Sequence, residues 1–169
     1  NVTIHVGAST GSTWLGITSD WNNLSNWCGG IPTSTRNVLI PVTANAPVIT
    51  GTTGQSKDIT IASGASLTIA SGASLEMTGN MTNDGTLTNN GSIKLNGTTA
   101  QTFPGGSGGT VTPMNILEVD NGAGVTVNKK ITIKNALLPT AGNITLTDTI
   151  RLFSDASTTA RVGQLGATA

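Results

Sequence analysis

Short apolar–polar–apolar triplets recur along most of this sequence. In each triplet the first and third residues are Ile, Leu, Val or Met, and the middle residue is polar or charged. Successive side chains of a β-strand point to opposite faces, so both apolar residues of a triplet lie on one face. Nowhere do apolar residues recur at helical spacing over several turns. The triplets predict short strands at 59–61, 67–69, 75–77, 93–95, 125–127, 131–133, 144–146 and 150–152.

The spacing of the triplets predicts how these strands are arranged. The segment 63–70 is followed directly by 71–78, which repeats it with a step of eight residues, and the step then shortens to six. Asn-Gly and Asp-Gly pairs follow, and they favour the positive φ that a sharp corner needs. In an antiparallel meander each pair would be a hairpin turn, but three-residue strands would bury little. We therefore predict a parallel β-solenoid with three sides per coil, each coil having about 20 residues.

Two regions depart from this regularity. Residues 1–50 contain all three tryptophans, and bulky aromatic side chains beside the first coil would cover the apolar core that an open solenoid end exposes. Residues 97–113 contain a Gly-rich run, which we interpret as a loop bulging from one coil, with a flexible hinge as the alternative. The expected organisation is a single all-β domain, with a Trp-containing cap and first coils at 1–50 and the solenoid at 51–169.

Composition narrows the classes of partner. Charged residues make up 9% of the chain, and eight basic residues balance eight acidic ones. Without a basic excess we expect no nucleic-acid partner. No apolar run approaches the roughly 20 residues of a membrane span, so we expect no membrane insertion. A surface rich in Thr, Ser, Asn and Gly favours a secreted protein. The N-terminus lacks the pattern of a signal peptide, which indicates a processed chain or a fragment.

The Trp-containing region and the repeats together resemble a known family. The run Trp14–Pro32, which leads into Val38–Pro41 and Pro47–Ile49, is similar to a module of large secreted and cell-surface proteins of the Bacteroidetes. The Ser-Gly-Ala-Ser-Leu-Thr-Ile repeats and the segment Leu152–Gly163 resemble its continuation. The resemblance implies a right-handed parallel β-helix within an adhesin-like protein exported by the type IX secretion system. No C-terminal sorting domain is recognisable, so we expect a longer parent protein.

The chain offers little for catalysis, and we expect neither enzymatic activity, a cofactor nor a metal ion. Glu118 and Asp120 share one face of a strand, which is the nearest approach to a glycosidase pair, but a solvated face explains them more simply. The lone His5 is expected to be structural. Asp20 is expected to be a turn or cap residue rather than a calcium ligand. Cys28 is expected to be a buried free thiol, with pairing to a cysteine outside this segment as the alternative.

A second set of residues bears on binding and modification. Trp14, Trp21 and Trp27 could cover the first coil, or they could form an exposed platform on which a polysaccharide stacks its sugar rings. Asp148–Ile150 resembles a Bacteroidetes O-glycosylation motif, with Thr149 as its acceptor.

Three classes of function compete. The leading one is a non-catalytic structural or adhesive module that contacts other domains of a surface protein, or assembles end to end with copies of itself. A carbohydrate-binding module that uses the Trp cluster is the alternative. A fragmentary enzyme domain ranks last.

Overall fold

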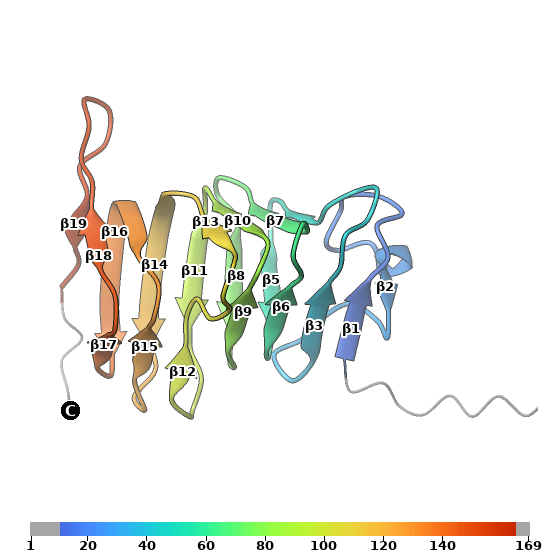
Figure 1. The fold of residues 1–169 in the computed structure, drawn as a ribbon, viewed down its shortest axis with the longest axis horizontal. Coiled ribbons are helices and arrows are strands. Elements are labelled where there is room, and N and C mark those ends of the chain that lie inside the picture. Colours follow the sequence, from blue (N-terminus) through green and yellow to red (C-terminus); the bar gives the residue numbers. More distant parts are fainter. Residues whose placement is uncertain (1–10, 165–169) are drawn as a thin grey trace, which may run out of the picture.

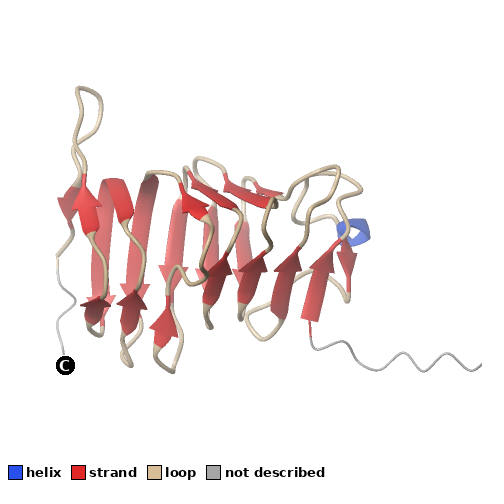
Figure 2. Cartoon of the chain, viewed as in Figure 1, coloured by secondary structure: helices blue, strands red, loops and turns tan. Residues whose placement is uncertain are grey.

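The computed structural model describes residues 11–164, which form a β-solenoid of about six turns. Successive turns follow one another along the long axis of a rod (Figure 1). Short strands joined by loops make up nearly all of it, and a 3-10 helix, η1 (Leu24–Asn26), lies near the N-terminal end (Figure 2). The predicted all-β solenoid is confirmed. His5 lies outside the described residues.

The strands form four sheets. Sheet A contains β2 (Trp27–Cys28), β1 (Gly11–Trp14), β3 (Asn37–Ile40), β6 (Ile59–Ile61) and β9 (Met81–Asn83). Sheet B contains β13 (Thr110–Val111), β10 (Thr86–Asn89), β7 (Ser66–Ile69) and β4 (Val48–Ile49). Sheet C contains β18 (Ile150–Leu152), β16 (Ile131–Ala141), β14 (Met114–Asp120), β11 (Ser92–Leu95), β8 (Ser74–Met77) and β5 (Thr53–Ser56), and β19 (Arg161–Val162) also pairs with β16. Sheet D contains β12 (Gln101–Thr102), β15 (Val125–Val127) and β17 (Ile144–Leu146). A parallel bridge between Thr82 and Gly105 joins sheet A to the segment after β12, so sheets A and D share one side of the rod.

Strands of successive turns pair in parallel. Leu67 aligns with Leu87, 20 positions later, and Leu75 aligns with Ile93, 18 positions later. Within residues 11–164, the pairing of β1 with β2 is the one antiparallel strand pair. These spacings confirm the coil of about 20 residues and rule out the meander. The eight-residue sequence repeat corresponds to β7 and β8, which are consecutive sides of one turn, in sheets B and C.

The inward residues of each turn stack in columns that form the core. In sheet C one column runs through Leu75, Ile93 and Leu117, all fully buried. In sheet A the column through Val38, Ile59 and Met81 is likewise buried. Each fully buried side chain of this size contributes about 1.5–3 kcal/mol relative to exposure. Because every column spans several turns, a turn gains most of its stability from the turns above and below it.

Two columns change from an aliphatic residue to asparagine inside the rod. Asn83 follows Ile61 in register, and Asn89 follows Ile69. Both side chains are fully buried. The Asn83 amide donates to the Thr110 carbonyl at 2.9 Å, and the Asn89 amide donates to the Ile116 carbonyl at the same distance. These side chains therefore bond to the backbone of the next turn.

Glycines serve two different purposes at the corners. Gly64 and Gly72, in the Ser-Gly-Ala repeats, have φ of +79° and +78°, which side chains rarely adopt. Gly85 and Gly91 do not have positive φ, so the expectation for the Asp-Gly and Asn-Gly corners was wrong. A Cβ on Gly91 would lie 2.1 Å from the carbonyl oxygen of Ala73 in the preceding turn. Glycine is needed at these corners because neighbouring turns approach closely.

The Gly-rich segment 97–113 forms part of the rod, with residues 103–105 buried and residues 106–108 exposed at its surface. It contains β12 and β13, and Phe103 is fully buried in the core. The Asp84 carboxylate accepts hydrogen bonds from the backbone N–H of Ser107 at 2.7 Å and of Gly108 at 3.2 Å. These bonds lower the pKa of Asp84. The segment therefore forms part of one turn and is tied to the turn before it.

We expect Gly91→Ala to lower the free energy of unfolding by about 1–3 kcal/mol or more, because the added Cβ collides with backbone that cannot move alone. Urea denaturation would measure the change. Gly122→Ala is the matched control, since no heavy atom lies within 4 Å of the added Cβ and φ is not positive. Equal stabilities of the two variants would contradict close packing of the turns at this corner.

Candidate functional site

The three tryptophans form one buried cluster at the N-terminal end of the rod. Their exposed fractions are 1% for Trp14, 1% for Trp21 and 5% for Trp27. The Trp27 ring meets each of the other two edge to face, with ring centroids 4.8 Å apart in both pairs. The Trp14 indole N–H donates to the Asn45 carbonyl at 2.7 Å, and that of Trp27 donates to the Trp21 carbonyl at 2.7 Å. The cluster joins the core of the first turns.

A buried asparagine shapes the chain around this cluster. Asn26 closes η1, and its side-chain oxygen accepts from the Thr18 N–H at 2.7 Å. Its amide donates to the Thr18 hydroxyl and to the Asp20 carbonyl, both at 2.7 Å. Asn26 is fully buried, so these bonds satisfy an amide that would otherwise be costly to bury. They hold the segment between the tryptophans over the end of the solenoid.

These positions bear directly on the two interpretations of the tryptophans. A sugar platform requires ring faces open to solvent, because the pyranose stacks on the aromatic face. The burial of all three rings leaves no such face, so the structure contradicts the platform. The rings instead pack over the first turns, in the position expected of a cap.

Cys28 lies in β2, next to this cluster, and its position corrects the sequence interpretation. The side chain is exposed and unpaired, whereas the sequence favoured a buried thiol. Its register partner in β1 is Thr13, and its neighbour Trp27 takes the inward position instead. Because side chains alternate along a strand, burial of Trp27 places Cys28 on the outside.

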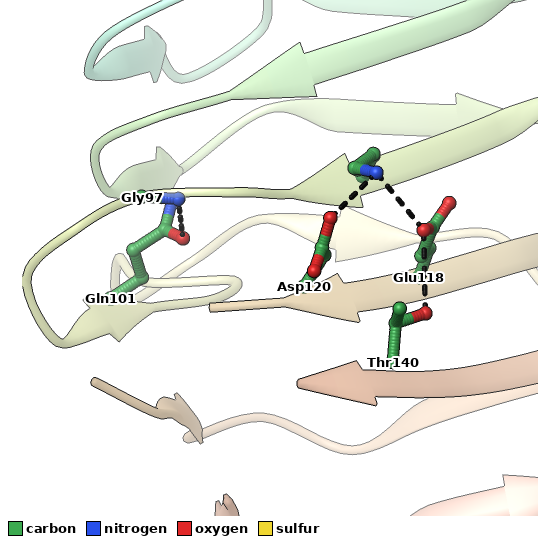
Figure 3. A network of polar contacts seen from close by, with 6 residues as sticks. Gly97, Gln101, Glu118, Asp120 and Thr140 are labelled. Carbon is green, nitrogen blue, oxygen red and sulfur yellow. Dashed lines mark hydrogen bonds and ion pairs between the residues drawn. The ribbon is translucent and has the colours of Figure 1, made fainter. Parts of the chain in front are cut away.

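Glu118 and Asp120 lie on the outer face of sheet C, as the alternation predicted, and both bind Lys94 of the neighbouring strand (Figure 3). The Lys94 ammonium is 3.1 Å from Glu118 Oε1 and 2.7 Å from Asp120 Oδ2. The Thr140 hydroxyl, one strand further on, donates to the same Glu118 oxygen at 3.3 Å. The network therefore links three strands, β11, β14 and β16, across successive turns.

Both carboxylates of this network share the single ammonium of Lys94. The hydrogen bond to Asp120 raises the pKa of Lys94, burial opposes the rise, and Glu118 adds to it. Lys94 thus stays protonated and shares its charge between the two carboxylates. A glycosidase pair needs one carboxyl as a proton donor and the other free to act on a sugar or a water molecule. In this geometry both carboxylates instead hold the sheet face together.

A second polar cluster, which the sequence did not indicate, occupies the corner between sheets C and D (Figure 3). Gln101 is nearly fully buried. Its side-chain oxygen accepts from the Gly97 N–H and from the Asn121 amide, each at 2.9 Å. Its own amide donates to the Met77 carbonyl at 3.0 Å. These bonds span three turns, which gives the cluster a structural role.

The remaining acidic residues and the helix content of residues 11–164 bear on metal binding and on membrane insertion. In this range no three His, Cys, Asp or Glu residues gather as metal ligands would. Asp20 accepts from the Asn22 N–H at 2.9 Å, which confirms it as a turn residue. Over the same residues, η1 is far too short to traverse a lipid bilayer, and no longer helix exists.

Thr149, the predicted O-glycosylation acceptor, is exposed. The carboxylate of Asp148 accepts from the N–H of Thr149 at 2.7 Å and from the N–H of Lys130 at 2.8 Å. The Thr149 hydroxyl makes no hydrogen bond within the described chain. It is accessible for modification, and its glycosylation stays a prediction.

We expect Trp27→Ala to destabilise the protein by about 3–5 kcal/mol, because it removes the central ring of the cluster and leaves a cavity. Denaturant unfolding followed by circular dichroism would measure this. Leu24→Ala is the control, since Leu24 is 64% exposed and its loss should cost little. Wild-type stability in the Trp27 variant, or quenching of the indole fluorescence by neutral oligosaccharides, would contradict a buried cap.

Comparison with known proteins gives a family but no activity. The model of one family, described as a domain of unknown function, DUF8693, matches residues 13–105, more than half of the chain. Neither the curated proteins nor the solved structures contain a match. The matched region runs from within β1 to the bridge at Gly105, so it includes the Trp cluster and the following turns as one unit. The chain belongs to the DUF8693 family.

Proposed function

We propose that this chain is a non-catalytic structural and adhesive module that acts outside the cell as a rod. The observation that carries the proposal is the position of the exposed large apolar side chains along the rod. Among residues 11–164, the large apolar side chains that are exposed all lie in the first two turns or in the last one: Leu15, Ile17, Leu24, Ile31, Leu39, Val42, Leu146, Leu152 and Val162. Apolar surface that gathers in this way favours contacts with other proteins. The rod therefore makes its contacts at its ends.

The last described turn supports end-on contact in more detail. Leu146 aligns with Val127, Leu152 with Ile133, and Val162 with Leu137. The three partner residues are buried, whereas Leu146, Leu152 and Val162 are 39–53% exposed. Each exposed side chain thus continues a core column and would be covered by one more layer of β-structure. That layer comes from a neighbouring segment of the parent protein or from another copy of the chain.

The proposed location of the rod is the cell surface, as part of a larger protein. The resemblance of the Trp-containing run and the Ser-Gly-Ala repeats to Bacteroidetes surface modules supports export by the type IX secretion system within a larger adhesin-like protein. The low content of charged residues and the hydroxyl-rich outer positions of the strands are consistent with an extracellular surface. A display module needs length and stiffness rather than a reaction centre, and stacked turns supply both.

Sedimentation velocity at rising protein concentration tests the end contacts. We expect the wild-type chain to associate, and the double variant Leu152→Lys and Val162→Lys to stay monomeric, because charges would be buried at the contact. Thr60→Lys, on the side of sheet A, is the control and should associate like the wild type.

The variant Ile17→Lys, at the opposite end of the rod, distinguishes two ways in which copies could associate. Loss of association in this variant too would indicate head-to-tail stacking, whereas unchanged association would indicate pairing of two C-terminal ends. A wild-type chain that stays monomeric at all concentrations would contradict association between copies and leave a neighbouring segment as the covering layer. Loss of association in the Thr60→Lys control would contradict contact through the ends.

A further inference from the structure

A polar groove lies along the corner where sheet C leads back to the side formed by sheets A and D. Its volume is about 500 Å³. The lining residues come from the segment before β3 and from the corners after β5, β8 and β11, so the groove passes successive turns. They are Ser34, Thr35, Lys57, Thr78, Thr98 and Thr99. The groove therefore runs along the rod axis.

The wall formed by Ser34 and Thr35 is held in place by specific bonds. The Thr78 hydroxyl donates to the Ser34 carbonyl, which ties this segment to a residue of a later turn. The Thr35 hydroxyl contacts that of Thr33 at 3.2 Å. Next in the chain, the Arg36 guanidinium donates to the Gly29 carbonyl. The bond from Thr78 uses the Ser34 backbone carbonyl, so the Ser34 hydroxyl is not needed to hold this wall in place.

Four of the lining side chains have polar groups that form no hydrogen bond or ion pair with the described residues. The hydroxyls of Ser34, Thr98 and Thr99 and the ammonium of Lys57 make no hydrogen bond or ion pair within residues 11–164. No acidic or aromatic residue lines the groove. Asp58, the acid next to Lys57 in the chain, accepts from the Asn80 N–H at 2.8 Å and is not part of the lining. The groove thus combines one positive charge with several free hydroxyl groups.

We propose that this groove binds an acidic saccharide, with a uronate carboxylate on the Lys57 ammonium and sugar hydroxyls on Ser34, Thr98 and Thr99. The carboxylate accepts charge-assisted bonds from an ammonium, which are stronger than neutral ones. Each threonine or serine hydroxyl can both donate to and accept from a sugar hydroxyl. A neutral sugar would lack the aromatic face that usually holds it, so the charge selects the ligand. The direction of the groove suits a linear polymer.

This site goes beyond the structural role proposed above, because a rod needs no ligand. It would give the module an affinity for acidic polysaccharide along one corner, separate from the protein contacts at its ends. It is also independent of the buried tryptophans.

Calorimetric titration with oligogalacturonate tests the proposal. We expect wild-type binding, and about tenfold or greater weakening in Lys57→Gln, as for the loss of one hydrogen bond to a charged group. The double variant Thr98→Val and Thr99→Val should also bind more weakly. All three residues are exposed, so the variants should unfold at the wild-type temperature.

Lys130→Gln is the matched control, because Lys130 is also exposed but lies outside the groove, and it should bind like the wild type. Dextran of similar length should not bind. Three results would overturn the proposal: absence of oligogalacturonate binding, equal weakening in the Lys57 and Lys130 variants, or dextran binding of equal affinity. Each would leave the association of the rod through its ends unaffected, so the two proposals can fail separately.

Discussion

The parallel hydrogen bonding between successive turns is the interaction on which the rest of this structure depends. The N–H of Thr68 donates to the carbonyl of Pro47 in the turn before it, and the N–H of Thr86 donates to the carbonyl of Ala65. These bonds set the spacing of neighbouring strands at about 4.8 Å. At that spacing the inward side chains stack in columns, and a Cβ at Gly91 has no room. One constraint therefore accounts for the stacked core and for the glycines at the corners.

The same constraint determines where chemical groups can gather. Outward side chains of neighbouring turns lie one strand apart, so charges such as Lys94 and Glu118 pair along a face and hold successive turns together. Polar residues that turn inward, such as Asn83 and Gln101, must bond to the backbone of another turn, because water does not reach them. Unpaired polar groups remain at the corners of the rod and uncovered apolar side chains remain at its ends, and the two proposals rest on these two places.

The alternation and step of the triplets were enough to predict the fold class and the coil length, because both follow from backbone geometry and apply at every turn. The paired acids on one face followed from the same alternation. Tertiary features were harder to predict. The Asn-Gly pattern predicts positive φ at Gly91, since the sequence does not show how closely another turn approaches. The glycines around Phe103 predict a loop, whereas in the structure they allow close packing of Phe103 against the preceding turn. The burial of the tryptophans could be settled only by the fold around Asn26.

Deletion of one complete turn tests most directly whether the register between turns holds the rod together. Removing residues 59–80 joins Asp58 to Met81 and places Met81 over Val38, so the core columns continue. We expect this variant to fold into a shorter rod that unfolds cooperatively. Removing residues 59–69 takes away two of the three sides of that turn and should abolish cooperative unfolding, as measured by circular dichroism during thermal denaturation. Cooperative unfolding of both deletion variants, or loss of folding in the whole-turn variant, would contradict the claim that register between turns holds the rod together.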